Sequence, residues 1–588
     1  MTTTSITSRS GDSHPAASAT RLAGDRGSAL IVVMVTMTIL IALVTVGLNH
    51  AIGSTKFNDR QANWNEALAA AESGVDDYLA RLNKDDSYWQ TADCSNIALR
   101  GNPAVTGTRS SCSWGAGTPL GWRKVPGPLP GAGSGEAPPK GEFHYDIDVS
   151  ETPIDGTITI RSTGRVEGVT RTVQSVLRRG GFGEFLYYTV YETVDPANEA
   201  VYTSASERAA RALDCPRYWW ATPKRGSDCS DINFVTGDVM NGPMHTNDAM
   251  LISGSPRFNG STTTSYPSCR GATNQRYCYR SNGTTSPAFA KGIGYRAEIE
   301  LPTSIGDMRQ YVTPAGPGVN GVAPEYLGCL YTGPTRIIAN SNGTLRIWSK
   351  WSGRPGGPAL NPGCGSATDL QSTSGATVSL PHNKVIMVQN VPAAQTTPAA
   401  GACATGAIGD GLPVANDINT ALSENACRNG NLYIEGVIKG RVTMVTDNNV
   451  IVTGDITYAG GENGTDVLGL IAENSVKIYH PVNSSGNNLL RNNSRPVLTN
   501  VTLSAAVLTL QHSFTVQYYQ RGAKLGTLKV YGSLAQRFRG PVGTSGGSGY
   551  LKNYNYDTRL RYSPPPYFLD PVRSGWGQKV YGEVSPKY

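Results

Sequence analysis

A run of twenty residues without a charged side chain, Ala29–Leu48, constrains this chain more than any other feature. At a rise of ~1.5 Å per residue, a helix over this run would be about 30 Å long, which is the thickness of the hydrocarbon core of a bilayer. A secretory signal peptide usually has a shorter apolar region and ends in a small-residue cleavage site, and no such site follows here. We therefore expect a single-pass membrane protein whose folded body lies outside the cytoplasm, at the cell surface.

The residues on either side of this run predict a leader and a longer helix. Residues 1–27 are rich in Ser, Thr, Ala and Gly and lack apolar periodicity, which is typical of a disordered leader. After the run, apolar residues recur at spacings of three, four and seven, as on one face of an amphipathic helix: Phe57, Trp64, Leu68, Ala71, Val75, Tyr78 and Leu82. A continuous helix over residues 28–82 would be roughly 80 Å long, with its first half in lipid and its second half packed on a folded domain.

Three short motifs occur in order along this helix: Arg26-Gly27-Ser28-Ala29-Leu30-Ile31-Val32, Asp59-Arg60-Gln61-Ala62 and Ala70-Ala71-Glu72-Ser73-Gly74. In this order they resemble the PilX-type N-terminal region of type IV pilus minor pilins, from Arg26 to near Asp85. The resemblance implies that a prepilin peptidase cleaves between Gly27 and Ser28. It also implies that the apolar segment anchors the protein in the membrane and contacts other pilin-like subunits in a fibre.

The sequence departs from major pilins at the fifth position after this cleavage site, where they carry a glutamate and this chain has Val32. In a shaft subunit, the resemblance implies, that carboxylate neutralises the N-terminal amine of a neighbouring subunit within the apolar core, where an unpaired charge is costly. A subunit at the very tip has no neighbour above it, and tip pseudopilins similarly lack the glutamate. We therefore favour a tip or initiating role. The alternative is a membrane-tethered protein that never enters a fibre.

Ten cysteines fall into successive near neighbours along the chain, and none forms a CxxC motif. Local pairing would give five disulfides: Cys94–Cys112, Cys215–Cys229, Cys269–Cys278, Cys329–Cys364 and Cys403–Cys427. Spacing alone does not fix this connectivity, and free buried thiols are the alternative. Disulfides would indicate an oxidising compartment outside the cytoplasm.

The region after the helix, residues 83–180, predicts a loop closed by a disulfide and then a small antiparallel sheet. Its first part is rich in Gly and Pro, and its second part alternates apolar with polar residues at Phe143, Tyr145, Ile147, Val149, Ile158 and Ile160. A further strand is expected over Val169–Leu177. A long helix followed by an antiparallel meander is the pilin-like arrangement.

Another pattern begins at about Asp231 and is clearest over residues 430–545. Short β-branched runs separated by Gly, Asn and Asp recur with a period near 20 residues, for example at Leu432/Ile434, Val450/Val452, Val476/Ile478 and Leu528/Val530. Such a period predicts a parallel β-solenoid, in which each coil buries its inner face against the next. A β-sandwich is the alternative. The expected fold is therefore α+β and mostly β, with residues 181–262 as the start of the β-rich body and 430–545 as the solenoid.

Two other segments lack this period. Residues 263–429 hold six of the ten cysteines, and we expect them to be an insertion, or several disulfide-closed loops, projecting from the solenoid. Residues 546–588 are rich in Tyr and Pro and predict an extended C-terminal tail lying along the solenoid.

Composition and motifs argue against several classes of function. The net charge of +7 is spread along the chain without a dense Lys/Arg block, so we expect no nucleic-acid partner. The sequence has no zinc-type Cys/His spacing, no P-loop and no GxGxxG that follows a strand and opens a helix. We expect no cofactor, no metal and no catalytic residue.

Two polar clusters are candidate sites. His245-Thr246-Asn247-Asp248 could bind a metal or serve in acid–base catalysis, but no second His or carboxylate stands nearby at ligand spacing, and a turn between strands is favoured. Asp447-Asn448-Asn449 offers oxygen ligands but lacks the twelve-residue calcium-loop pattern, so that a turn is again favoured.

The expected function is therefore structural. We expect a minor pilin or pseudopilin-like protein that initiates or caps a type IV pilus-like fibre and presents a surface for a glycan or protein ligand. One alternative is a membrane-anchored, polysaccharide-active solenoid enzyme, which would require charged residues such as Asp455, Glu473, Arg537 and Arg539 to converge. Another alternative is a free-standing anchored adhesin.

Overall fold

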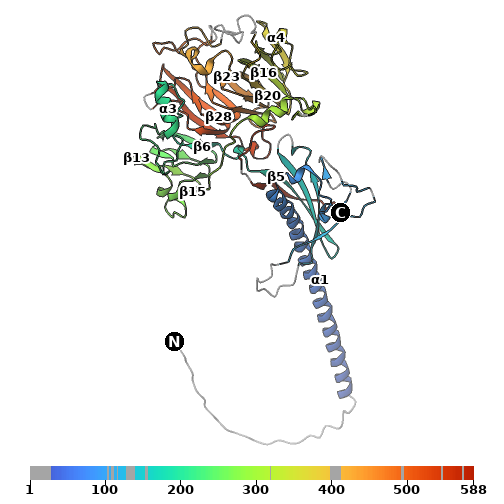
Figure 1. The fold of residues 1–588 in the computed structure, drawn as a ribbon. Helices are drawn as coiled ribbons and strands as arrows, with labels where there is room; N and C mark the ends of the chain where they lie inside the picture. The colour runs from blue at the N-terminus through green and yellow to red at the C-terminus, as the bar shows by residue number, and fades with distance from the viewer. Residues whose placement is uncertain are drawn as a thin grey trace, which may run out of the picture.

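The computed structural model describes residues 28–85, 87–101, 105–107, 112–115, 117–127, 139–152, 156–317, 319–396, 412–491, 495–544, 547–572 and 575–588. It has two folded parts, which we call the stem and the body, and the first half of helix α1 extends away from both (Figure 1). The stem consists of α1 and a six-stranded sheet, and the body comprises the β-rich chain between residues 182 and 572. The predicted leader, residues 1–27, lies outside the described residues.

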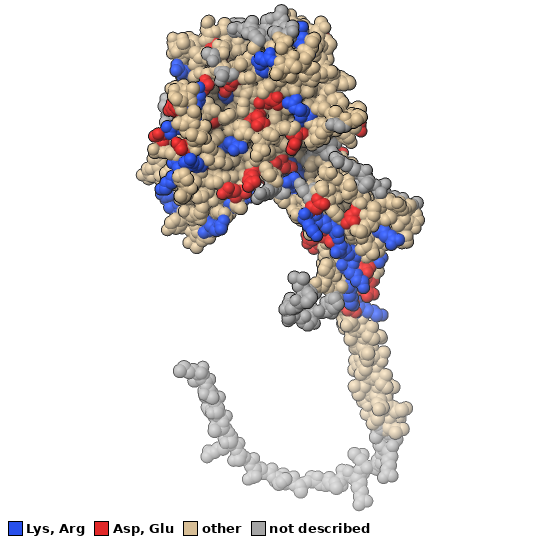
Figure 2. All heavy atoms as spheres, in the orientation of Figure 1, with Lys and Arg blue, Asp and Glu red and all other residues tan. Residues whose placement is uncertain are grey.

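Helix α1 runs from Ser28 to Lys84, which confirms the helix predicted over residues 28–82. Its large apolar side chains between Leu30 and Ile52 are 47–69% exposed, and no charged residue interrupts this half (Figure 2). By length and composition α1 could cross a membrane, with a mean hydropathy of 2.7 over its most apolar window. Thr36, Thr38 and Thr45 donate their hydroxyls to carbonyls four residues earlier, which satisfies the polar atoms of this half within the helix.

The second half of α1 packs on the small sheet through small and aromatic side chains that are at most 3% exposed: Ala67, Ala70, Ala71, Val75, Tyr78 and Leu82. Close approach depends on Gly164, because a Cβ there would lie 2.1 Å from the carbonyl oxygen of Ala67. Phe57 and Trp64, which were expected to begin the packed stripe, are 70% and 48% exposed, because the sheet packs closely on the helix only from Ala67 onward.

The stem sheet has the order β1-β3-β4-β5-β30, with β2 beside β3. Its strands are β1 (Val105–Thr106), β2 (Arg123–Lys124), β3 (Glu142–Asp148), β4 (Thr157–Val166), β5 (Val169–Arg179) and β30 (Trp576–Val584). The strands β3, β4 and β5 pair antiparallel, and they fall where the alternation of apolar residues predicted them. Strand β30 comes from the C-terminal end of the chain and pairs antiparallel with β5, so the whole body is inserted between two neighbouring strands of the stem.

The body contains two α-helices, 24 strands and several short 3₁₀ helices among the described residues. The first strands are β6 (Tyr187–Tyr191), β7 (Asn233–Phe234), β8 (Val239–Asn241), β9 (Met244–Thr246), β10 (Leu251–Gly254), β11 (Arg257–Phe258), β12 (Thr262–Thr264), β13 (Arg280–Thr285), β14 (Ala288–Phe289) and β15 (Ile293–Tyr295). The next are β16 (Cys329–Thr332), β17 (Thr335–Ala339), β18 (Thr344–Ser349), β19 (Ala376–Ser379), β20 (Lys384–Gln389), β21 (Leu432–Ile438), β22 (Arg441–Thr446) and β23 (Val450–Tyr458). The last are β24 (Val467–Ala472), β25 (Val476–Ile478), β26 (Thr502–Thr509), β27 (Phe514–Val516), β28 (Lys524–Phe538) and β29 (Gly549–Tyr556).

The helices of the body are short. The α-helices are α3 (Ala205–Asp214) and α4 (Ala367–Gln371). The 3₁₀ helices of the chain are η1 (Tyr88–Gln90) and η2 (Ile97–Leu99) in the stem, then η3 (Phe182–Glu184), η4 (Pro267–Cys269), η5 (Gln275–Cys278), η6 (Gly306–Val312), η7 (Pro324–Tyr326), η8 (Ile418–Ala421), η9 (Ser423–Asn425) and η10 (Thr558–Arg561).

Most strands of the body pair in parallel with a strand of the preceding or following turn of chain. One ladder has the order β16-β20-β22-β24-β26-β28-β6-β9-β12-β15. A second has the order β17-β21-β23-β25-β27, and a third the order β28-β29-β8-β11-β14. Antiparallel pairing occurs where β18 and β19 extend β17.

The order of the strands in space differs from their order in the chain. Strand β28 lies beside β6, so the last turns of the body stack directly on the first ones, and the chain between β15 and β16 must run back along the stack. This return segment, residues 296–328, contacts one strand end after another: Tyr188 donates its hydroxyl to the carbonyl of Ile299 at 2.6 Å, and the amide of Ile305 donates to Glu473 at 2.9 Å.

The middle of the first ladder is buried on both faces. Along β20, Ile386 and Val388 lie in the central core, while Val385 and Met387 lie in a second cluster with the return segment and the C-terminal chain. Tyr567 and Phe568, near the Pro run, are 8% and 9% exposed in that cluster, as expected for a tail that lies along the body. Burial on both faces explains why β20 and β24 are almost continuously apolar.

Four of the five predicted disulfides are confirmed: Cys94–Cys112, Cys215–Cys229, Cys269–Cys278 and Cys329–Cys364. Cys427 is also disulfide-bonded, and Cys403 lies outside the described residues.

Two segments differ from their expected roles. Residues 263–429, expected as a projecting insertion, contribute β16, β17 and β20 to the parallel ladders, because three buried apolar strands interrupt the loop-rich chain. Residues 546–588, expected as an extended tail, contain β29 of the body and β30 of the stem. Strand β30 pairs with β5, from Trp576 opposite Arg179 to Val584 opposite Thr172.

Candidate functional site

The exposed half of α1 begins where the predicted processing site ends. Ser28 is the first residue of the helix, and Gly27 lies outside the described residues. Val32 points away from the chain with 60% of its surface exposed, and the first turn of α1 contains no acidic residue. The helix therefore offers an apolar surface without the carboxylate that major pilins carry at this position.

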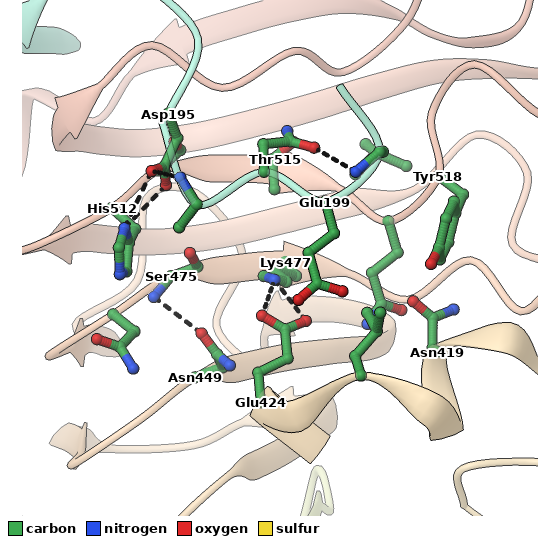
Figure 3. A pocket seen from close by; sticks show the side chains of 18 of the residues that line it. Asp195, Glu199, Asn419, Glu424, Asn449, Ser475, Lys477, His512, Thr515 and Tyr518 are labelled. Atoms are coloured by element: carbon green, nitrogen blue, oxygen red, sulfur yellow. Dashed lines mark hydrogen bonds and ion pairs between the residues drawn. The ribbon is translucent and has the colours of Figure 1, made fainter. Parts of the chain in front are cut away.

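A polar pocket of about 280 Å³ opens on the side of the body (Figure 3). Its floor is the outer face of the second ladder, where Lys477 of β25 and Thr515 of β27 occupy the same register. The residues that alternate with them, such as Val476 and Phe514, are at most 1% exposed in the core. The pleat of two stacked strands thus places polar side chains in the pocket and apolar ones behind it.

Two excursions of the chain form the walls of this side pocket. Residues 195–208, which lead from the chain after β6 into the first turn of α3, bring Asp195 and Glu199 over the floor, and residues 417–424 bring Asn419 and Glu424 from the opposite side (Figure 3). Asp195 is held by the backbone amide of Ala197, which donates to its carboxylate at 2.9 Å.

Each charged side chain described in the side pocket has a partner of opposite charge. Nζ of Lys477 lies 2.6 and 2.5 Å from the two carboxylate oxygens of Glu424. Nδ1 of His512 lies 3.1 Å from the carboxylate of Asp195. Arg208 lies 3.5 Å from Glu199. The pocket therefore has polar walls and little uncompensated charge.

In the Asp195–His512 pair, each residue shifts the pKa of the other. Burial opposes the protonation of His512, but the charge of Asp195 and the hydrogen bond to it raise the pKa of the imidazole above its ordinary value. Burial likewise opposes the ionisation of Asp195, but the charge of His512 and hydrogen bonds lower the pKa of the carboxyl. Both groups are therefore held in their charged forms.

The two sequence clusters considered as sites have structural roles. His245 is fully buried, and its ring nitrogens lie 2.9 Å from the hydroxyl of Thr263 and 3.0 Å from the side-chain oxygen of Asn247. Burial lowers its pKa to about 4, so it is neutral at physiological pH. Within the described part of the chain, no group of three His, Cys, Asp or Glu residues could hold a metal ion.

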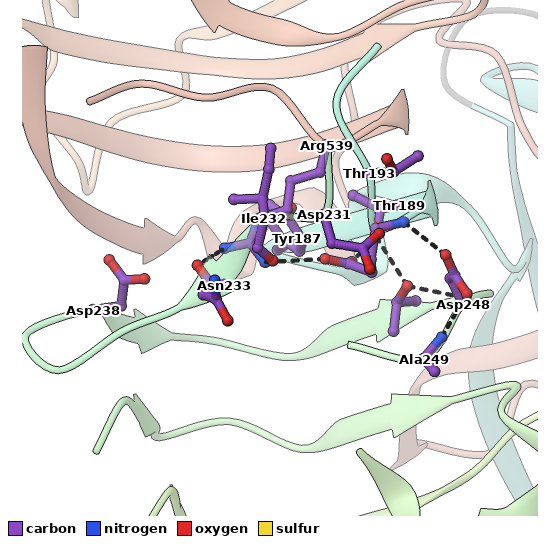
Figure 4. Close-up of polar contacts among 12 residues, drawn as sticks. Tyr187, Thr189, Thr193, Asp231, Ile232, Asn233, Asp238, Asp248, Ala249 and Arg539 are labelled. Carbon is purple, nitrogen blue, oxygen red and sulfur yellow. Dashed lines mark hydrogen bonds and ion pairs between the residues drawn. The ribbon is translucent and has the colours of Figure 1, made fainter. Parts of the chain in front are cut away.

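Asp248 belongs to a buried network of charges (Figure 4). Its carboxylate accepts from the backbone amides of Glu192 and Trp219 at 3.0 and 2.9 Å and pairs with Arg225. Beside it, Arg539 pairs with the fully buried Glu192 at 3.1 Å. These contacts fix the turns around β6 and β9 and leave no carboxylate of the network free for substrate chemistry.

The Asp447 cluster lies at a corner of the stack. Side chains there form ladders from one turn of chain to the next: the amide of Asn449 receives the backbone N–H of Ser475 at 3.0 Å, and Asn474 donates to Asn448. This agrees with the favoured interpretation as turns.

Each of the four residues that the enzyme alternative requires hydrogen-bonds to another part of the chain. Asp455 accepts from the amide of Thr502, and Glu473 accepts from that of Ile305. Arg537 donates to the carbonyl of Leu510, and Arg539 is inside the body with Glu192.

The sequence did not predict that the residues of the side pocket form a site. Asp195 and His512 stand 317 positions apart, and no local pattern links them. The one available signal is the register of the repeat, since Lys477 and Thr515 are polar residues enclosed by the apolar pairs of β25 and β27.

Comparison with protein-family models and with curated proteins gives no match. Among solved structures, the competence-associated pilin ComZ from Thermus thermophilus is similar over 89% of this chain and 96% of its own, with 11% identity and a TM-score of 0.25. Nothing about function follows from a likeness of this size.

Proposed function

We propose that this chain is a pilin-like surface protein of the minor pilin type that initiates or caps a type IV pilus-like fibre. In this proposal a prepilin peptidase cleaves between Gly27 and Ser28, and Ala29–Leu48 anchors the protein in the membrane. The same segment then contacts other pilin-like subunits, and the body is displayed outside the cell as a parallel β-solenoid with a binding surface.

The observation that carries the proposal is the division of α1 into two halves. Its second half is held by the stem sheet, whereas its first half projects with apolar side chains that are 47–69% exposed. Exposed apolar surface of this extent requires a lipid or protein partner. A secretory signal is removed from the mature protein, but this segment continues without a break into a helix that the stem needs for its own core.

Two further features support a terminal position in the fibre. The absence of a carboxylate at Val32 removes the partner that a neighbouring amine would need in an apolar core. The body is also broader than the stem and overhangs one side of it, which would obstruct the close packing of many copies along a shaft (Figure 1).

N-terminal sequencing of the membrane-extracted protein tests the processing and anchoring steps. We expect the mature chain to begin at Ser28, and substitution of Gly27 by Leu to leave the leader attached. A mature chain that begins beyond Leu48 would rule out the proposal, because it would lack the projecting half of α1.

The role in a fibre is tested by counting surface fibres in a deletion strain. We expect fewer fibres, restored by the wild-type gene. Normal fibre numbers would instead favour a free-standing anchored adhesin. Turnover of pectin-like or glucan substrates by the purified protein would favour the enzyme alternative.

A further inference from the structure

We infer that the side pocket is a binding site for a neutral, hydroxyl-rich ligand of about one ring, namely a hexose or N-acetylhexosamine unit of a surface glycan. The inference rests on the proposed function only in requiring that the body be displayed outside the cell. It assigns a ligand class to one particular site on that body.

Two buried amide groups in the pocket wall lack part of their hydrogen bonding. Asn449 is 1% exposed, and its side-chain oxygen receives the N–H of Ser475, but its Nδ2 has no partner among the described residues. Asn419 is also 1% exposed, and its Nδ2 donates to Asp417 at 2.8 Å, but its Oδ1 has no partner among them. Both residues line the side pocket.

An unpaired buried polar group is costly, and such groups are usually satisfied by a ligand or water. Here one free group is a donor and the other an acceptor. The hydroxyl groups of one ligand can accept from Asn449 and donate to Asn419, whereas a carboxylate or phosphate can only accept. The pair therefore favours hydroxyl groups over anions.

The charged residues of the side pocket also favour a neutral ligand. The ion pairs Lys477–Glu424, Asp195–His512 and Arg208–Glu199 leave no described charge in the pocket without a partner. A charged ligand would have to break one of these pairs, but a neutral ligand can hydrogen-bond to their remaining lone pairs and protons.

The size and one wall of the pocket fit a sugar ring. A volume of about 280 Å³ lies just below the range of ~300–1,000 Å³ for small-molecule sites, which suits one ring and not a long chain. Tyr518 lines the pocket in a left-handed conformation with φ 40°, which is uncommon for a residue other than glycine. Its ring can cover the apolar face of a pyranose while the amides bind the hydroxyls.

The test uses the full-length protein in detergent and five separate probes: glucose, galactose, mannose, N-acetylglucosamine and N-acetylgalactosamine. Glucuronic acid serves as the anionic comparison. Saturation-transfer NMR detects contact, and titration calorimetry measures the affinity. We expect saturable binding of at least one neutral probe and weaker binding of the glucuronate.

Two variants locate the site. Asn449→Asp keeps the oxygen that receives Ser475 and replaces the free donor by an acceptor, and we expect affinity to fall about tenfold or more. Ala197→Trp fills the pocket from its exposed rim without touching the ladders, and we expect binding to be lost. Ala290→Trp, at an exposed position between β14 and β15 and outside the side pocket, is the matched control and should bind as wild type does.

Binding that is equal in all variants, binding of glucuronic acid alone, or no binding of any neutral probe would overturn the inference. These results are separable from the proposed function. If fibre number and the Ser28 terminus are as expected but no sugar binds, only the pocket assignment fails. If sugar binds but fibres are normal in the deletion strain, only the fibre role fails.

Discussion

At the scale of single residues, the body keeps its buried charges in pairs and uses them to join distant parts of the chain. Arg539 joins Glu192 inside the body, and His512 joins Asp195 at the rim of the side pocket. Each pair links residues more than 300 positions apart, at the place where the last turns of chain meet the first ones. The two ion pairs therefore hold the last turns of chain against the first ones, which are not consecutive in the sequence.

The Asp195–His512 pair should make stability depend on pH. Because the pKa of His512 is raised, its protonated form stabilises the fold below the ordinary value of about 6.5, and this contribution is lost as the pH rises through the raised pKa. Because the pKa of Asp195 is lowered, its contribution is present above the ordinary value of about 3.9 and is lost as the pH falls through the lowered pKa. The pair thus stabilises the body most between pH ~4 and ~6.5.

Thermal unfolding of the wild type and Asp195→Asn between pH 5 and pH 8.5 checks this expectation. The difference between their midpoints should be largest at the acid end and shrink toward pH 8.5. Titration of other residues cancels in this difference. A constant difference across the range would contradict the assignment of the pair.

Breaking the Arg539–Glu192 pair should be far more costly than breaking an exposed one. Glu192→Gln leaves the guanidinium of Arg539, which is 2% exposed, without its carboxylate, and we expect a loss of about 3–5 kcal/mol in the free energy of unfolding. The control is Glu462→Gln, which removes the exposed pair with Lys529 and should cost less than ~1 kcal/mol. Urea unfolding measures both, and equal losses would refute the distinction.

At the scale of elements, close packing of α1 on the stem sheet depends on glycine. We expect Gly164→Ala to destabilise the stem by about 1–3 kcal/mol, because its Cβ would lie 2.1 Å from the carbonyl oxygen of Ala67. Gly577→Ala in β30 is the matched control, since a Cβ there meets no atom within 4 Å. Thermal unfolding compares them, and a neutral Gly164→Ala would show that the helix can move away at no cost.

The disulfides can be checked by mass spectrometry of peptides prepared without reduction. We expect the four observed pairs, and for Cys427 we still predict Cys403 as its partner. Each disulfide that closes one of the shorter loops should contribute roughly 3 kcal/mol to the free energy of unfolding. A reducing agent should therefore lower the midpoint of thermal unfolding. Free thiols in protein extracted from cells would contradict an oxidising compartment.

Local patterns were enough to predict α1, β3, β4 and β5, because their signals are an apolar run and the alternation of neighbouring residues. Pairing at long range was not predictable in this way. Strand β30 reads as part of a polar tail until β5 is known to be its partner. The return segment did carry a signal, because Leu301, Ile305, Met308 and Val312 recur at spacings of four, three and four, but it lay within chain interpreted as an insertion.

The candidate site was less predictable still. The pocket requires the register of stacked turns together with two excursions, and neither follows from a single sequence. His245 was expected in a turn between strands but lies within β9, while Asn247 and Asp248 lie in the bend that follows it.

At the scale of the whole molecule, the body is an insertion into the stem. The chain leaves the stem after β5 and returns before β30, and Arg178–Asp570 and Lys579–Glu184 join the two connections. The stem therefore cannot complete its sheet until the body has been synthesised.

Ending the chain after Pro571 tests this dependence. The truncation removes β30, including Trp576 of the stem core, so we expect the stem to unfold at a lower temperature while the body keeps its own transition. Calorimetry distinguishes the two transitions. A chain ending after Val584 keeps β30 and loses the contacts of Lys587 with Asp146 and Thr172 and those of Tyr588 with Asp146 and His144, so its stem transition should lie much closer to that of the wild type. An unchanged stem transition in the shorter chain would show that β30 is dispensable.

The double connection between stem and body has a mechanical consequence. Strands β5 and β30 are antiparallel neighbours. The body is attached to the last residue of β5 and to the first residue of β30, Arg179 and Trp576, which lie opposite each other. A drag force on the body therefore pulls both strands in one direction, and their mutual hydrogen bonds are not peeled apart in succession. Two polypeptide segments share the tension, and it passes to the helix through the packed core of the stem.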